Sequence, residues 1–220
     1  MEISRTWAIV SDVALGFLFV CICGVIAMFG MPGQPYEGAL PPLTEEQEAL
    51  AEQLQADVEV LAGEFPDREM RHPEEYRAAR EYIVSQLEEA GWEPELERFE
   101  FRGLEAANVV VERRGASAPG EVVLVGAHYD AVPNSPGADD NASGVAGLLA
   151  IAREFADATP ERTVRFVFFA NEEAPYYHTD AMGSLRHARQ AKAAGEEVVV
   201  MMSLEMLGFY TPEPGSQAYP

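Results

Sequence analysis

The sequence predicts an α/β fold, in which a mostly parallel (mixed) sheet is sandwiched between helices. Three apolar runs, Val122–Ala127, Thr163–Ala170 and Glu197–Leu204, are typical of strands that are buried on both faces. Helical segments separate these runs along the chain, and strand–helix–strand order favours parallel pairing with right-handed crossovers. The 220 residues are enough for one domain with a sizeable core.

The first segment, residues 1–31, is predicted to be a transmembrane anchor. Thr6–Met31 is almost wholly apolar and is long enough to cross a bilayer. Arg5 precedes this stretch and acidic residues follow it from Glu37, so the positive-inside rule predicts that the body lies outside the cytoplasm. The alternative is a signal sequence whose cleavage releases a secreted protein.

Residues 32–43 are rich in Pro and Gly and predict a linker, and residues 44–220 form the folded domain. The spacing of hydrophobic residues, and the residues that typically begin or end helices, predict its helices and strands. The predicted helices are Thr44–Leu61, Pro73–Ala90, Asn141–Phe155 and Gly183–Ala194. Two further strands are predicted at Glu95–Phe101, which alternates as an edge strand does, and at Asn108–Glu112.

The composition is strongly acidic, with a formal net charge of −22 and a pI of about 4.4. Such a surface repels phosphate backbones, so the sequence argues against a nucleic-acid partner. Solubility, or an environment rich in salt, accounts for the acidity without any specific function. The sequence carries no signal of oligomeric state.

Four polar clusters follow one another along the middle of the chain, each near the end of a predicted buried strand. They are His128-Tyr129-Asp130, Asp139-Asp140-Asn141, Asn171-Glu172-Glu173 and Ser203-Leu204-Glu205. In open α/β sheets, ligands collect outside the carboxyl ends of the strands. One imidazole and several carboxylates on a rigid frame are the groups that a hard or borderline dication needs. The clusters therefore predict a metal site.

The residues suit the parts of a two-metal hydrolase. Asp140 suits the ligand that bridges the two ions. His128 and Glu205 suit one ion, and Glu173 suits the other. Glu172 suits the base that takes a proton from the attacking water, and Asp130 could orient the imidazole through its second nitrogen.

Each group also has a purely structural interpretation when it is taken alone. Asp140 could cap a loop, and Glu172 and Glu173 could form a solvated turn. His128 could be a core histidine whose ring nitrogens are hydrogen-bonded. Glu205 is harder to explain in this way, because an acid between Leu204 and Met206 in an apolar run needs a partner or a cation.

The four clusters together resemble the co-catalytic zinc peptidases of family M28, of the aminopeptidase Y and bacterial leucyl aminopeptidase type. The resemblance covers roughly Tyr76 to Pro220. It implies a phosphorylase/hydrolase-like zinc peptidase fold, two zinc ions and a peptide substrate whose N-terminal bond is hydrolysed by a zinc-activated water. By position it implies metal ligands at His128, Asp140, Glu173 and Glu205, with Glu172 as the base and Asp130 as the partner of the histidine. It also implies a cis peptide at Asp140–Asn141.

The chain departs from the family pattern at two points. Many members carry Asp where this chain has Glu205, which keeps the same donor atom. The family's last ligand is a histidine far downstream, whereas 15 residues follow Glu205 here. The resemblance therefore implies a sequence truncated at its C-terminus, with an exposed sheet edge and impaired activity. Of the other histidines, His72 and His187 are predicted at the surface. His178 is predicted in a loop near the crevice, with a role in the substrate pocket or as an ordinary loop residue, and substitution as a ligand is the alternative.

Two other functions fit the same residues. A glutaminyl cyclase resembles this family in fold but uses one zinc and catalyses acyl transfer without hydrolysis. A catalytically impaired ectodomain could keep the fold and only bind partners, although a binding module does not need a base such as Glu172 beside metal ligands. Zinc is the expected metal, and manganese or cobalt also suits a carboxylate-rich site.

Overall fold

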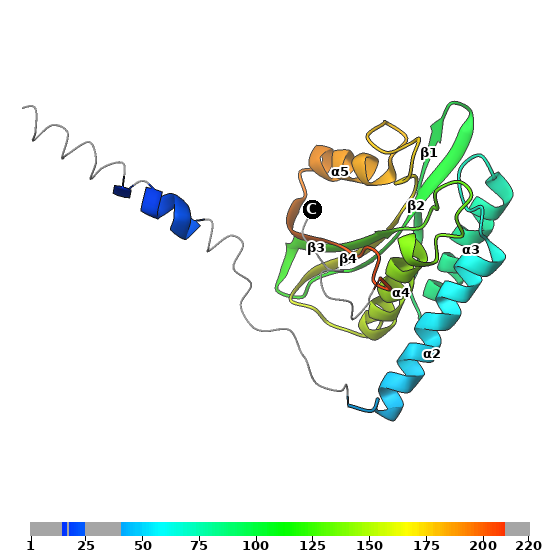
Figure 1. Cartoon of the computed structure of the whole chain (residues 1–220), viewed down its shortest axis with the longest axis horizontal. Helices are drawn as coiled ribbons and strands as arrows, with labels where there is room; N and C mark the ends of the chain where they lie inside the picture. Colours follow the sequence, from blue (N-terminus) through cyan, green and yellow to red (C-terminus); the bar gives the residue numbers. More distant parts are fainter. Residues whose placement is uncertain (1–14, 17, 25–40, 210–220) are drawn as a thin grey trace, which may run out of the picture. The chain divides into compact units, whose positions relative to one another are not determined.

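Five strands form one mixed sheet in the order β1-β2-β4-β3-β5. The structure, a computed structural model, describes residues 15–16, 18–24 and 41–209 of the chain (Figure 1). The strands are β1 (Glu95–Phe101), β2 (Leu104–Arg113), β3 (Ala118–His128), β4 (Arg162–Phe169) and β5 (Glu197–Ser203). β3 pairs in parallel with β4 and β5, whereas β2 pairs antiparallel with β1 and β4. The sheet is mixed as predicted, but only half of its ladders are parallel.

Helices cover both faces of the sheet. They are α2 (Glu45–Glu59), α3 (Pro73–Glu89), α4 (Gly144–Phe155) and α5 (Gly183–Ala194), with short π-helical segments η1 (Val60–Glu64) and η2 (Ala138–Ser143). α3 and α4 lie on one face and α5 lies on the other (Figure 1). The α/β sandwich is therefore confirmed, and α4 is the crossover that joins parallel strands β3 and β4.

The ends of the first two helices follow their sequence signals. The hydroxyl of Thr44 accepts a hydrogen bond from the Gln47 amide, and the Gln47 side chain accepts one from the Thr44 amide, which completes a capping box. Pro73 opens α3 at a position where its missing N–H costs nothing. Near the end of α2, the buried carboxylate of Asp57 accepts hydrogen bonds from Arg153 on α4 and joins the two helices.

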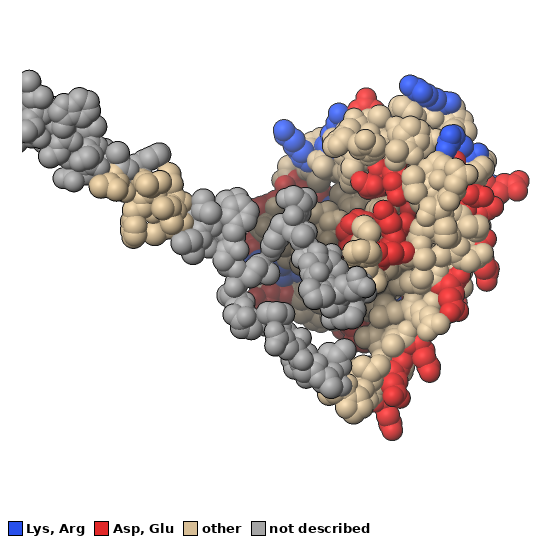
Figure 2. All heavy atoms as spheres, in the orientation of Figure 1, with Lys and Arg blue, Asp and Glu red and all other residues tan. Residues whose placement is uncertain are grey.

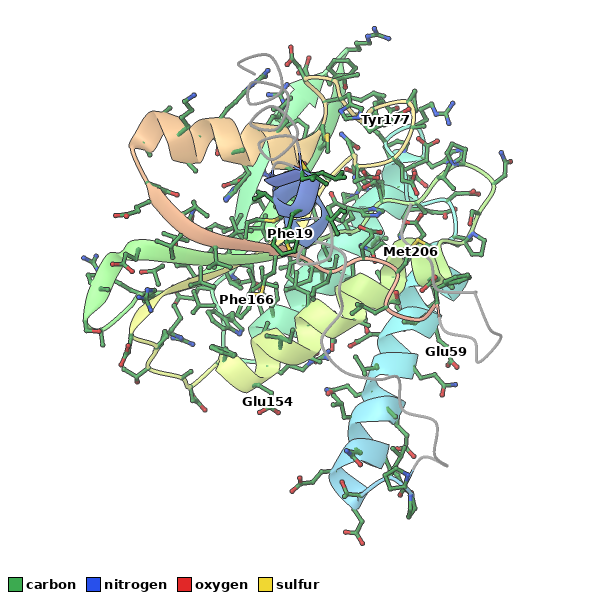
Figure 3. All side chains as sticks on the ribbon, turned by 60° about the vertical axis from the view of Figure 1, so that its left-hand side comes forward. Phe19, Glu59, Glu154, Phe166, Tyr177 and Met206 are labelled. Carbon is green, nitrogen blue, oxygen red and sulfur yellow. The ribbon has the colours of Figure 1, made fainter. Side chains whose placement is uncertain are left out.

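The main core lies between the sheet and the layer of α3 and α4. Phe166 of β4 is fully buried there, and its ring meets Trp92 and Phe155 edge-on, with ring centroids 5.8 Å apart in both pairs. Figure 3 shows Phe166 between the sheet and α4, whereas Glu154 on α4 points away from the sheet. This packing gives the carboxyl ends of β3 and β4 a rigid base.

β5 forms one edge of the sheet, and within the described residues no strand pairs with its outer side. β5 lies beside β3, and its side chains from Val198 to Met202 are 39–50% exposed. This agrees with the exposed edge that the sequence predicts. On the face drawn in Figure 2, basic side chains gather over α5 and near the β1–β2 turn, whereas acidic side chains lie mainly along the side that carries α2 and α3.

The contacts divide the chain into two units, Met1–Pro42 and Leu43–Pro220. The predicted anchor over residues 1–31 and the predicted linker over residues 32–43 fall mainly outside the described residues. In the described portion, none of the helices combines the length and the apolar character that a membrane span requires.

Candidate metal centre

The sheet brings the ends of its three parallel strands to one edge. His128 is the last residue of β3 and lies beside Phe169, the last residue of β4, in the ladder. On the other side of β3, Gly126 pairs with Ser203 at the end of β5, and its carbonyl accepts a hydrogen bond of 2.8 Å from the Leu204 amide. The segments that follow β4 and β5 therefore start next to His128.

Three of the predicted ligands meet at this edge. The Nε2 atom of His128 lies 3.1 Å from Asp140 Oδ1 and 3.2 Å from Glu205 Oε1. One donor atom from each of the three residues lies within 4.8 Å of the others. The imidazole is buried, whereas the two carboxylates are 45% and 44% exposed. The cluster is thus open to solvent on its carboxylate side and rigidly held on its histidine side.

Electrostatics indicates that this cluster needs a cation. Burial alone would lower the pKa of His128, but hydrogen bonds to Asp130, Asp140 and Glu205 raise it to about 12. The pKa of Asp140 is lowered, mainly by its hydrogen bond with His128. Both shifts favour a positive charge between the two carboxylates, and a metal ligated by neutral His128 would supply that charge.

Glu173 lies close to the cluster but outside the group of three. Burial, and then the charge of Asp140, raise its pKa to about 7. Its Oε1 atom is buried and has no hydrogen-bond partner among the described residues. An orphaned carboxylate oxygen beside other acids is where a second cation would fit. The donor set therefore suits zinc, with three residues that could hold one ion and an adjoining carboxylate.

Asp130 has a larger structural role than the sequence suggests. Its two carboxylate oxygens accept hydrogen bonds from the backbone amides of Glu172 (2.9 Å) and Glu173 (3.0 Å). Oδ1 also lies 3.4 Å from His128 Nδ1. Asp130 is 1% exposed. One buried carboxylate thus ties the glutamate turn to the histidine.

Glu172, the predicted base, borders a small cavity of about 170 Å³. Burial is the main cause of a pKa above its ordinary value, and the neighbouring acids Asp130, Glu205 and Asp140 act in the same direction. The apolar part of the cavity wall consists of Phe169, Met182 and Met201. A raised pKa suits a group that must take up a proton near neutral pH.

The loop before Asp140 is shaped by backbone constraints. Gly137 has a φ of +56°, and the Asp140–Asn141 peptide is cis, as the resemblance implies. The Asn141 amide group donates to the Leu204 carbonyl (2.9 Å) and to Glu205 Oε2 (3.3 Å). Figure 3 shows Met206, the residue after Glu205, beside the N-terminal end of α4. Asn141 thus connects the loop to the Glu205 segment.

Two residues that support the site are assigned no role from the sequence, namely Asn171, which belongs to one of the four predicted clusters, and Arg68, which no sequence pattern identifies. Asn171 is buried with a φ of +57°, accepts a hydrogen bond of 2.9 Å from Tyr76 and donates one of 3.0 Å to the Ala181 carbonyl. An asparagine directly after a buried strand is a signal for such a left-handed position. Arg68 is fully buried beneath the loop. It lies between two helices, where no periodic pattern predicts its burial.

The remaining histidines lie outside the group of three ligands. His72 is exposed, as predicted. His178 is exposed as well and is not part of the group. The predicted surface position of His187 is wrong, since its side chain is 5% exposed and its Nδ1 atom lies 2.8 Å from Glu97 Oε1. α5 turns this residue toward β1 because its apolar face packs on the sheet.

Comparisons with known proteins give a family and a fold. The sequence profile described as Peptidase family M28 matches residues 108–220. An uncharacterized protein of Escherichia coli K12, YfbL, is 34% identical over 211 residues, which are 92% of this chain and 62% of that protein. The chain therefore spans less than two thirds of that relative.

Two solved structures share the fold. A Zn-dependent exopeptidase from Parabacteroides distasonis has a TM-score of 0.58 and 24% identity, covering 77% of this chain and 63% of that one. A glutaminyl cyclase from Tannerella forsythia has a TM-score of 0.59 and 24% identity, covering 71% of this chain and 62% of that one. The two proteins are named for different reactions although they share one fold, so the fold alone does not show which reaction this chain catalyses.

Proposed function

Because the chain belongs to peptidase family M28, we propose that it is a zinc-dependent exopeptidase that hydrolyses the N-terminal peptide bond of its substrate. The observation that carries this proposal is the meeting of His128, Asp140 and Glu205, whose donor atoms lie within 4.8 Å of one another at the ends of β3 and β5 and at the start of the α4 region. Three separate chain segments supply them, as a built ligand set requires.

In this proposal the residues divide the work. His128, Asp140 and Glu205 would hold one ion, and Glu173 would hold a second ion together with Asp140. When bound, zinc supplies a Lewis acid that polarises the scissile carbonyl and makes water a stronger acid. Glu172 takes the proton from the attacking water and delivers it to the leaving amine. Asp130 keeps both glutamates in place through their backbone amides.

A glutaminyl cyclase activity is the second candidate, and one observation favours it. The group of three ligands, without Glu173, is enough for a single zinc ion with an open position. The zinc content of the purified chain separates the two functions. Two ions for each chain support the peptidase, whereas a single ion together with ring closure of an N-terminal glutamine supports the cyclase.

The decisive test of the peptidase compares the chain with its Glu172→Gln variant. Both proteins are loaded with zinc and incubated with aminoacyl-nitroanilides. We expect zinc-dependent release of nitroaniline to fall by about 10²–10⁴-fold in the variant, which is the usual contribution of a general base. Zinc uptake should stay the same, since Glu172 is not a proposed ligand. Equal release by both proteins would refute the assignment, whatever the absolute rate.

The proposal includes attachment to a membrane, with the catalytic domain outside the cytoplasm. It rests on the apolar stretch Thr6–Met31 and on the charges that flank it. Membranes from cells that produce the full chain, or the chain without residues 1–31, are washed with alkaline carbonate. The full chain should stay in the membrane and the shortened chain should not. A mature protein that begins after residue 31 would instead indicate a cleaved signal sequence.

A further inference from the structure

Arg68 is a fully buried arginine whose guanidinium contacts no carboxylate among the residues that the structure describes. It lies between η1 and α3 and is 0% exposed. Every hydrogen bond that its guanidinium makes within the described residues goes to a backbone carbonyl. These carbonyls belong to Tyr129 (2.8 Å), Leu61 (3.1 Å), Phe65 (3.4 Å), Pro136 (2.5 Å) and Gly137 (2.6 Å).

Three of these carbonyls lie in the loop that separates two proposed ligands. Tyr129 directly follows His128, whereas Pro136 and Gly137 shortly precede Asp140. The backbone of Arg68 adds a fourth link, because its carbonyl accepts a hydrogen bond of 3.2 Å from the Ala131 amide. A single side chain therefore ties the beginning of the loop to its end. The distance between His128 and Asp140 depends on this closure.

We propose that Arg68 is a positioning residue that holds Asp140 against His128 and so sets the zinc affinity of the site. The inference rests on the proposed metal function. Within the described residues the Arg68 guanidinium bonds only to backbone carbonyls, so it acts on the site through the loop backbone.

The geometry requires an arginine. Its planar fork offers five N–H groups in fixed directions, whereas a lysine offers one point with three rotatable donors. The fork reaches Tyr129 with Nε and Pro136 and Gly137 with its two terminal nitrogens. Gly137 leaves room for this contact, because a Cβ there would lie 2.4 Å from the Asp140 carbonyl oxygen and 2.7 Å from Arg68 Nη2. A lysine keeps the charge but cannot reach both ends of the loop.

The positive charge of Arg68 and its positioning role should affect zinc affinity in opposite directions, so removal of the charge distinguishes them. Burial lowers the pKa of Arg68 to about 10, against the raising effect of the nearby acids Asp130, Asp140 and Glu173. A buried cation next to these acids repels a dication. If its electric field dominated, removal of the charge would tighten zinc binding. If positioning dominates, removal weakens zinc binding.

The experiment measures zinc affinity by competition with a chromophoric chelator, using the full chain. The variants are Arg68→Lys, which keeps the charge, and Arg68→Met, which removes it. Arg153→Lys is the control, because Arg153 is also a largely buried arginine and holds Asp57 and Gln86 at the far end of α4. Thermal unfolding of each metal-free protein reports the purely structural cost.

We expect zinc affinity to fall at least tenfold in both Arg68 variants and to change less than threefold in the control. The visible spectrum of the cobalt-loaded protein should change in the Arg68 variants alone, because it reports the geometry of the ligands. Unchanged affinity in Arg68→Lys, tighter binding by Arg68→Met, or an equal loss in Arg153→Lys would each overturn the inference.

Two further outcomes are kept distinct. If the Arg68 variants do not fold, Gly137→Ala presses on Arg68 and on the Asp140 carbonyl from the loop side, and a loss of zinc affinity is expected. Normal zinc binding by this variant would contradict the inference, because the contact between Arg68 and the loop would then not matter. If the unmodified chain binds no zinc, the proposed function fails. If it binds zinc and the variants bind it equally well, only the role of Arg68 fails.

Discussion

At the scale of single residues, Asp130 connects the glutamate turn to the histidine of the site. Its buried carboxylate accepts hydrogen bonds from two consecutive backbone amides and also faces His128. An Asp130→Asn substitution replaces one acceptor oxygen with an NH₂ group, which then faces a backbone N–H. We expect zinc affinity to fall by about 10–100-fold, the usual cost of disturbing a group that orients a ligand.

The control for this prediction is Asp180→Asn. Asp180 is an exposed aspartate that pairs with Arg189 on α5. Its substitution should leave zinc affinity unchanged, and calorimetric titration of both variants with zinc provides the measurement. Full affinity in Asp130→Asn would mean that the glutamate turn holds its shape without this carboxylate.

Site residues can be predicted from the sequence where a residue with a metal-binding side chain follows the end of a predicted strand. His128, Asp140 and Glu205 could be predicted to meet because parallel strands end at a common edge. Arg68 could not, since its partners are backbone carbonyls and leave no complementary residue types in the sequence. The surface position predicted for His187 is wrong because a helical pattern alone does not show which face of the helix will lie against the strand that carries Glu97.

At the scale of elements, the start of α5 depends on a close approach to the sheet. A Cβ on Gly183 would lie 2.1 Å from Asn108 Oδ1 and 2.6 Å from the Ala170 carbonyl. Asn108 is fully buried and uses its side chain to hold the Ala170 amide and the Gly183 carbonyl, so it has no room to move. Gly183→Ala should therefore destabilise the protein by about 1–3 kcal/mol or more.

Gly120→Ala provides the matched control. Gly120 lies in β3, and an added Cβ there meets nothing within 4 Å. We expect its effect on the free energy of unfolding to stay within about 0.5 kcal/mol. Urea unfolding curves of both variants make the comparison. Equal stabilities would show that α5 can shift away from β2 without cost.

Most elements could be predicted because their signals are local. Pro73 and Gly91 bound α3, and β1 and α5 have the bounds that the sequence predicts. The pairing of β2 could not be predicted, because its antiparallel ladder with β4 joins strands that are distant in sequence. The start of the third predicted helix also differs. Asp140 and Asn141 have non-helical backbone angles, and regular helix begins only at Gly144.

At the scale of the whole molecule, metal binding should stabilise the fold. The proposed ligands come from β3, η2 and the segment after β5, so an ion would join parts that unfolding separates. At a free zinc concentration of 100 times the Kd, the expected gain is about 2.7 kcal/mol. For a domain of this size, that gain corresponds to a rise of roughly 5–10 °C in Tm.

Thermal unfolding with zinc and with a chelator measures this gain. The Glu172→Gln variant should respond to zinc as the unmodified chain does, whereas His128→Ala should lose most of the response. A Tm that zinc does not change in the unmodified chain would contradict a metal centre at this edge.

Acid should weaken the fold through the pair of Glu97 and His187, which joins β1 to α5. Burial alone would raise the pKa of Glu97, but hydrogen bonds from His187 and Asn108 outweigh it and hold the pKa below its ordinary value of 4.5. A depressed pKa means that the unfolded chain takes up the proton first as the pH falls. The stabilisation from Glu97 is therefore complete well above pH 4.5 and is lost as the pH falls through the lower pKa of the folded state.

The formal charge of −22 complicates a simple acid titration, because protonation also relieves repulsion among the many other acids. The difference between the unmodified chain and Glu97→Gln isolates the pair. We expect the substitution to cost about 1–2 kcal/mol at pH 7, typical of a charge-assisted hydrogen bond, and progressively less below pH 4.5. Glu93→Gln, at an exposed position, should show no such trend.

Denaturant unfolding at several pH values, with a chelator present throughout, measures the stability that each variant loses relative to the unmodified chain. A loss for Glu97→Gln that stays constant with pH would mean that Glu97 acts through its shape and not through its charge.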